Sequence, residues 1–187
     1  MVGQPGIEER DDRTRRALLL LAASLPLSAG AAALVLTRHR ILAGVAAAGA
    51  ATALLAARSV RSEHPGARLA FGDGVLDRLF DACVLVPLAW TSRSGSNVDA
   101  VLALVCLGAS YLASYERARG EALGYAGSEG TGYRFTRYAI LVLGLLTGWL
   151  LAALWAYAAL TVAAAGVRAW NIALQERTDA GHGRSTP

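Results

Sequence analysis

The sequence contains no lysine, little charge and few aromatic residues. All 18 basic residues among its 187 are arginines, charged residues make up 17% of the chain, and Phe, Trp and Tyr together make up 7%. Hydrophobic residues reach 55%, whereas soluble domains average about 45 to 50% apolar and about 25% charged residues. This composition excludes a disordered chain and favours a single membrane domain over an ordinary soluble one.

Residues that would indicate common catalytic or metal sites are scarce. The two cysteines, Cys83 and Cys106, lie in apolar stretches, where a small buried side chain is the expected role. They do not form a disulfide framework and do not identify the redox compartment. The three histidines, His39, His64 and His182, lie in polar stretches without metal-ligand spacing. Catalytic triads, phosphate-binding loops of the Walker type and zinc spacings are not found in the sequence.

Several mainly apolar stretches are long enough to cross a membrane as helices, for which about 20 residues are needed. The sequence predicts helices over residues 17–36, 41–57, about 74–90 and 98–115, with a turn at the polar residues 91–97. The start of the first stretch also resembles a signal peptide, because arginines precede it and small residues follow at 28–31. The further apolar stretches favour a membrane helix instead.

Residues 135–167 form an apolar stretch that is too long for one membrane helix and short for two helices with a loop. A tight turn near Gly148 and Trp149 would divide it into two helices, giving six in total. Gly144 and Gly148 form a GxxxG pattern, which is more often used for packing within a chain than for a dimer interface. The predicted fold class is therefore an all-α integral membrane protein with six transmembrane helices.

The arginines are distributed unequally between the two ends of these six helices. One side holds most of them, and the opposite side holds only Arg38, Arg40 and Arg93. The positive-inside rule then predicts that both termini are cytoplasmic. We expect a cytoplasmic N-terminal segment at 1–16, a membrane domain at 17–175 and a disordered polar tail at 176–187. The net charge of +4 is not gathered in one stripe, so no nucleic-acid partner is predicted.

Three aspartates, Asp73, Asp77 and Asp81, recur at every fourth residue of the third predicted helix. They would form one stripe of carboxylates on that helix. Like charges this close repel each other unless a cation such as Mg²⁺ neutralises them. The alternative is structural: Asp77 pairs with Arg78 or another arginine, and Asp73 caps the helix.

A second polar cluster covers residues 114–124 and continues with Arg134 and Arg137. Arginine is a good phosphate ligand, because its planar guanidinium donates two hydrogen bonds at once. A cytoplasmic contact with anionic lipid is the alternative interpretation of the same residues.

The stretch FGDGVLDRLFDA at 71–82, followed by SYERARGEALG at 114–124, resembles the CDP-alcohol phosphatidyltransferase family. The likeness is strongest to bacterial phosphatidylinositol phosphate synthases and covers about residues 41–175. The family signature is D-x2-D-G-x2-A-R-x8-G-x3-D-x3-D. The resemblance implies six transmembrane helices and a polar site that opens to the cytoplasm.

The resemblance also implies a role for individual residues. Asp77 would be the general base and, with Asp73 and Asp81, a ligand of Mg²⁺ or Mn²⁺. Positively charged residues would hold phosphate groups: Arg58 on the nucleotide, and Arg117, Arg137 and Arg168 on the acceptor.

The implied reaction transfers a phosphatidyl group from CDP-diacylglycerol to a phosphorylated polyol, either inositol phosphate or glycerol phosphate, and releases CMP. Metal ions on the diphosphate would stabilise the charge that develops during transfer. The implied partners are the lipid bilayer and either a second copy of the chain or a related membrane subunit.

The first half of the family signature is missing. Aligned on Arg58, the two leading aspartates and the glycine would be Ala50, Ala53 and Leu54, and the only acid between Asp12 and Asp73 is Glu63. Two lost carboxylates weaken a two-metal site, although Glu63 could replace one of them. Three hypotheses follow: a transferase with a reduced metal site, a catalytically silent relative that serves as a partner subunit or regulator, and, outside the family, a small transporter or scaffold.

Overall fold

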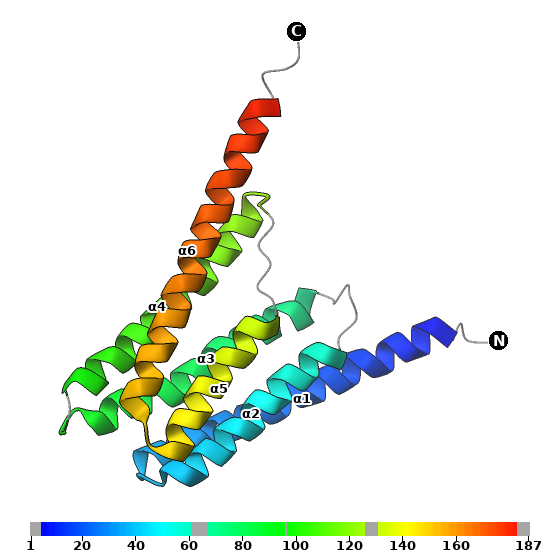
Figure 1. The fold of residues 1–187 in the computed structure, drawn as a ribbon. Coiled ribbons are helices and arrows are strands. Elements are labelled where there is room, and N and C mark those ends of the chain that lie inside the picture. Colours follow the sequence, from blue (N-terminus) through cyan, green and yellow to red (C-terminus); the bar gives the residue numbers. More distant parts are fainter. Residues whose placement is uncertain (1–4, 61–66, 96, 126–130, 183–187) are drawn as a thin grey trace.

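The computed structural model describes residues 5–60, 67–95, 97–125 and 131–182, and within these ranges the chain is helical without any strand (Figure 1). The helices are α1 (Pro5–Leu36), α2 (Arg40–Val60), α3 (Ala67–Ser92), α4 (Asn97–Ala122), α5 (Thr131–Thr147) and α6 (Leu150–His182). The all-helical class and the six helices agree with the sequence prediction.

Short turns join α1 to α2, α3 to α4 and α5 to α6, and all three lie at the same end of the bundle (Figure 1). The predicted break near Gly148 and Trp149 is confirmed, since α5 ends at Thr147 and α6 begins at Leu150. Gly148 has a φ of +82°, in the left-handed region that glycine adopts at no steric cost. This glycine lets the chain reverse direction within two residues.

Most helices extend beyond their predicted apolar limits. Helix α1 begins at Pro5 instead of residue 17, α3 begins at Ala67 instead of residue 74, and α4 continues to Ala122. The added residues are rich in Ala, Arg and Glu, which are good helix formers even where they are polar. Apolar stretches mark the part of a helix suited to lipid, so they underestimate its full length.

Helix α6 continues to His182 and therefore includes the first part of the expected polar tail at 176–187. The sequence NIALQER at 171–177 contains good helix formers and no proline or glycine, so the helix extends into the start of this tail. Residues 183–187 lie outside the described part of the chain.

The helices pack in a connected arrangement. Helix α1 contacts α2 and α3, α3 contacts α4, α2 contacts α5, and α6 contacts α4 and α5. Small side chains allow the close approach of α2, whose Ala43, Ala47 and Ala50 are completely buried. Gly144 has the same function between α5 and α6, where an added Cβ would lie 2.5 Å from Cβ of Ala153. Gly144 therefore serves packing within the chain.

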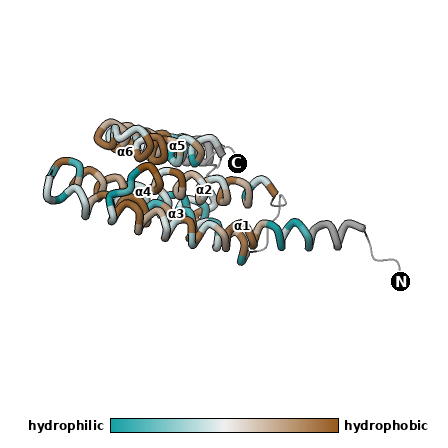
Figure 2. Tube along the Cα trace, turned by 90° about the horizontal axis from the view of Figure 1, so that it is seen from below, coloured by the Kyte–Doolittle hydropathy of each residue, from teal (hydrophilic) through white to brown (hydrophobic). Residues whose placement is uncertain are grey.

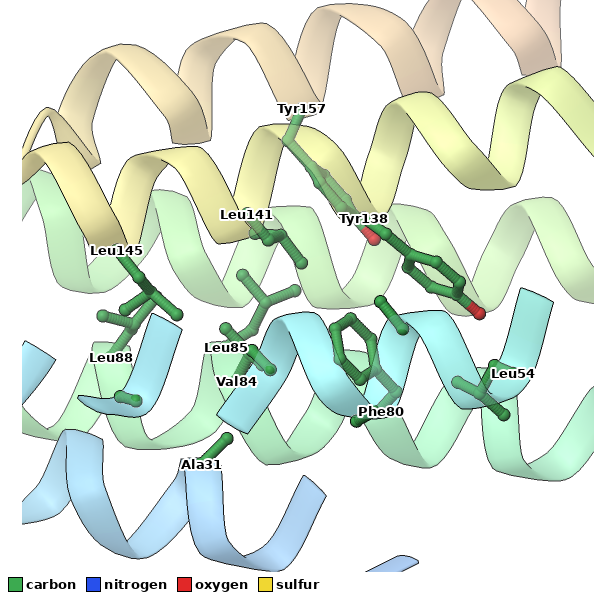
Figure 3. Close-up of a cluster of buried hydrophobic side chains, with 14 of the residues drawn as sticks. Ala31, Leu54, Phe80, Val84, Leu85, Leu88, Tyr138, Leu141, Leu145 and Tyr157 are labelled. Atoms are coloured by element: carbon green, nitrogen blue, oxygen red, sulfur yellow. The ribbon is translucent and has the colours of Figure 1, made fainter. Parts of the chain in front are cut away.

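Larger apolar residues fill the centre of the bundle. Figure 3 shows Phe80, Val84, Leu85 and Leu88 of α3 below residues of α5 and α6. The rings of Phe80 and Tyr138 lie edge to face, with centroids 4.7 Å apart and an interplanar angle of 65°. This aromatic pair supports one side of the polar cluster described below.

Figure 2 shows hydrophilic turns of α1 next to its grey first segment, and much of the remaining tube is coloured as hydrophobic or intermediate. Large hydrophobic side chains are exposed on every helix, among them Leu19, Leu42, Phe71, Leu104, Leu143 and Trp155. Four helical segments are long and apolar enough to cross a membrane: Asp11–Leu36, Arg40–Val60, Asn97–Ala122 and Leu150–Asn171. The chain therefore has the helices of a membrane protein.

Candidate functional site: a buried aspartate–arginine cluster

Helix α3 brings the three predicted aspartates together on one buried face. Asp77 and Asp81 are completely buried, and Asp73 is 5% exposed. Their spacing of four residues places them on successive turns of the same side of the helix. Asp73 does not cap the helix, because α3 begins six residues earlier, at Ala67.

Helix α5 supplies the arginines that face these carboxylates. Arg134 and Arg137 are 4% and 0% exposed, and Tyr138 is 2% exposed. Positions i, i+3 and i+4 of a helix lie on one face, so the sequence RFTRY directs these three side chains toward α3. A buried charge is costly unless it is paired, and each of these arginines is paired.

Asp77 is the most heavily bonded of the three aspartates. Its Oδ2 accepts hydrogen bonds from Arg78 and, at 2.8 Å, from Nη2 of Arg137. Its Oδ1 accepts a hydrogen bond from the Tyr138 hydroxyl and lies 3.9 Å from Nη1 of Arg134. Both carboxylate oxygens of the expected general base are therefore in use.

Asp81 shares two of these arginines. Its Oδ2 lies 3.3 Å from Nη1 of Arg78 and 3.3 Å from Nη2 of Arg137, and it accepts a hydrogen bond from the Ser110 hydroxyl of α4. Arg78 also donates to the backbone oxygen of Ser110, at 2.7 Å. The cluster thus joins α3, α4 and α5.

Asp73 lies at the end of the cluster toward α2. Its Oδ2 accepts a hydrogen bond from Nη1 of Arg134 at 3.1 Å, and Nη1 of Arg58 lies 3.7 Å from the same oxygen. Arg58 is the most exposed of the cluster's arginines, with 22% of its side chain accessible. It marks the side from which the cluster can be reached.

Among the residues that the structure describes, the cluster has more arginines than aspartates. Four arginines (Arg58, Arg78, Arg134 and Arg137) face three aspartates (Asp73, Asp77 and Asp81). Buried donors at Nε of Arg78 and at Nε and Nη1 of Arg137 have no acceptor within the described part of the chain. Unpaired buried donors are costly, so this arrangement suits an additional acceptor of negative charge, such as a phosphate oxygen.

The described residues fit a divalent cation poorly. Among them, no group of three or more His, Cys, Asp or Glu side chains is arranged as metal ligands. Mg²⁺ needs oxygen ligands at about 2.0 to 2.1 Å with near-octahedral geometry. Here Oδ2 of Asp77 already accepts hydrogen bonds from Arg78 and Arg137, so this oxygen could bind a metal only if it lost an arginine partner.

Other predicted site residues lie elsewhere or outside the description. Arg117 forms an ion pair with Glu121 along α4, at 3.9 Å, and no ion pair joins it to the three aspartates among the residues described. Arg168 lies in α6, but its side chain is outside the described part, and so is Glu63. The positions of the missing leading aspartates, Ala50 and Ala53, are 0% and 8% exposed.

Three members of the cluster were not identified as site residues from the sequence. Ser110 and Tyr138 stand in apolar stretches, where a single hydroxyl carries no recognisable signal. The sequence indicated Arg78 only as an ion-pair partner of Asp77, in the interpretation without a metal, and this ion pair is confirmed. The i, i+3, i+4 pattern of Arg134, Arg137 and Tyr138 is the signal that would have placed Tyr138 on the same helix face.

No protein-family model and no curated protein matches the chain.

Proposed function

We propose that this protein is a membrane-embedded relative of the CDP-alcohol phosphatidyltransferases that binds a phosphate-bearing ligand without transferring it, as a partner subunit or regulator of phospholipid synthesis. The observation that carries the proposal is the hydrogen bonding of the Asp77 carboxylate. Its two carboxylate oxygens accept hydrogen bonds from two arginines and a tyrosine. A carboxylate held in this way is a poor general base, because its lone pairs are directed at donors.

The arginines of the cluster are the reason for proposing a phosphate-bearing ligand. Within the described part of the chain, four guanidinium groups surround three carboxylates, and buried nitrogens of Arg78 and Arg137 have no acceptor there. A diphosphate or a phosphorylated polyol supplies oxygens that match these donors. Arg58, which is partly accessible, would make the first contact with such a ligand.

The proposed setting is the inner membrane of a bacterium, with six transmembrane helices and both termini in the cytoplasm. Four helical segments have the length and hydropathy of membrane spans, and α3 and α5 carry the buried charges. Intramembrane charges usually face a bundle interior and pair with one another. The arginine-rich side of the bundle faces the cytoplasm in this proposal.

Transfer of a phosphatidyl group from CDP-diacylglycerol to inositol phosphate or glycerol phosphate is the second candidate. It is favoured by one observation, the spacing of Asp73 and Asp77 on one buried face of α3, as in the second half of the family signature. Catalysis would require Mg²⁺ or Mn²⁺ to replace the arginine partners of these carboxylates.

CMP release distinguishes the two candidates. Purified protein would be given CDP-diacylglycerol, Mg²⁺ or Mn²⁺, and inositol phosphate, glycerol phosphate, inositol or serine in turn. We expect no acceptor-dependent CMP release. If CMP were released and Asp77→Asn abolished this release, the hypothesis of a catalytically silent relative would be wrong and the protein would be a transferase. Binding of CDP-diacylglycerol, measured in parallel, should weaken in Arg58→Gln and stay unchanged in Arg93→Gln, which lies at the opposite end of the bundle.

The cluster should also be insensitive to divalent cations. Because arginines already neutralise the three carboxylates, titration with Mg²⁺ or Mn²⁺ should not raise the thermal midpoint of the purified protein beyond the effect of equal ionic strength from NaCl. A saturable increase that disappears in Asp73→Asn would show that a metal competes successfully with the arginines.

A further inference from the structure

A second polar site lies at the other end of the bundle, where the three short turns meet (Figure 1). A pocket of about 400 Å³ lies at this end and is lined by Arg38 of the α1–α2 turn and by residues at the adjoining helix ends, including Arg40 of α2, Thr91 of α3, Asp99 of α4 and Leu150 of α6. Its volume is within the range of about 300 to 1,000 Å³ that is usual for small-molecule sites. None of its lining residues belongs to the aspartate–arginine cluster.

Arg40 is held in position without being neutralised. An added Cβ at Gly148 would lie 1.6 Å from Nη1 of Arg40, so the guanidinium occupies the space that the missing side chain leaves. Arg40 makes no hydrogen bond or ion pair with any residue in the described part of the chain. A guanidinium that is held in place and has all its side-chain donors available can bind an anion.

Arg38 is fixed nearby by its backbone and by one hydrogen bond. Its φ of +62° lies in the left-handed region, which is uncommon for residues other than glycine. One of its nitrogens, Nη2, donates to the backbone oxygen of Thr91, 3.3 Å away. The turn therefore presents two guanidinium groups to the same pocket, opposite a single carboxylate, that of Asp99.

Apolar side chains form another part of the pocket lining, at an end of the bundle that carries exposed tryptophans. Leu88 and Leu145, which Figure 3 shows next to each other at one end of the core, line it together with Val35 and Leu150. Trp90 and Trp149 at this end of the bundle are 58% and 76% exposed. Exposed tryptophans are typical of the membrane interface.

From these features we infer that the pocket binds the phosphate of a phospholipid headgroup. The two arginines would bind the phosphate, Asp99 would accept hydrogen bonds from headgroup hydroxyl or amine groups, and the apolar side chains would contact the start of the acyl chains. Free inorganic phosphate offers the same charge but leaves the apolar lining unused, so the lipid binds more tightly.

The test uses the full-length protein in a maltoside detergent, with binding of short-chain phosphatidylglycerol measured by native mass spectrometry or thermal shift. The same measurement with inorganic phosphate and with short-chain diacylglycerol separates the contributions of headgroup and acyl chain. We expect binding of phosphatidylglycerol and much weaker binding of either fragment. Binding of inorganic phosphate as tight as that of the lipid would overturn a lipid site.

Arg40→Gln should weaken phosphatidylglycerol binding about tenfold, because a charge-assisted bidentate contact is lost. The variant should fold, since Arg40 is exposed and bonds no described residue. Arg40→Lys keeps the charge without the bidentate geometry and should fall between Arg40→Gln and the unmodified protein.

Two control variants locate the site. Arg93→Gln should change the affinity less than about twofold, because Arg93 lies at the same end but is stacked on Trp90, 3.5 Å from the ring centroid. Arg58→Gln should also leave it unchanged, because Arg58 belongs to the aspartate–arginine cluster. If Arg58→Gln abolished phosphatidylglycerol binding and Arg40→Gln did not, the lipid would bind at the aspartate–arginine cluster and the proposal would be overturned. This outcome does not depend on whether the cluster binds a nucleotide.

Discussion

Replacing Arg137 with methionine should lower the free energy of unfolding by about 3 to 5 kcal/mol, the usual cost of breaking a buried ion pair from one side. Arg137 is completely buried and lies 2.8 Å from Asp77 and 3.3 Å from Asp81 through the same nitrogen. Methionine fills much of the same volume, so the loss is mainly electrostatic. Two buried carboxylates would then depend on Arg78 and Arg134.

Thermal or denaturant unfolding in detergent measures this loss, and Arg16→Met is its matched control. Arg16 pairs with Asp12 at 3.7 Å, but their side chains are 71% and 68% exposed. Such exposed pairs contribute less than about 0.5 kcal/mol. If Arg137→Met proved no more costly than Arg16→Met, the cluster would not hold the helices together as described.

A second substitution separates charge from packing. Adding Asp77→Asn to Arg137→Met removes one of the two carboxylates that have lost Arg137 as a partner, and it should restore part of the stability. If the loss came only from packing, the two effects would simply add, because neither would depend on the other. The double-mutant cycle therefore tests the ion pair itself.

The sequence predicted the positions of the helices better than their lengths. Mainly apolar stretches located all six, and the glycine at 148 located the turn that separates α5 from α6. Charged residues continue a helix as readily as apolar ones do, so hydropathy alone missed the start of α1 and the end of α6.

The sequence predicted the site residues that share one helix, but it did not predict which residues of other helices pair with them. The spacing of Asp73, Asp77 and Asp81 depends only on helical geometry, and the structure keeps it. Their pairing with Arg134 and Arg137 joins residues about 60 positions apart in the sequence, and such contacts depend on the packing of α5 beside α3. For the same reason, the sequence did not show that arginines of α5 pair with these carboxylates.

The aromatic support of the cluster gives the other large expected effect. Phe80→Ala should lower the free energy of unfolding by about 3 to 5 kcal/mol, because it opens a cavity in a packed core. Phe80 is completely buried, and its ring lies edge to face with Tyr138, 4.7 Å away (Figure 3). Unfolding in detergent measures the change, and Phe80→Leu, which leaves a smaller cavity, should cost less.

Phe71→Ala is the matched control, since Phe71 lies on the same helix but is 74% exposed. Its loss should change stability by no more than about 0.5 kcal/mol, because an exposed side chain leaves no cavity. Tyr138 donates a hydrogen bond to Asp77, and Phe80→Ala removes the ring that packs against Tyr138. We therefore expect Phe80→Ala also to reduce the coupling energy between Asp77 and Arg137 that the double-mutant cycle measures. Unchanged coupling in that background would show that the charged cluster keeps its geometry without the aromatic pair.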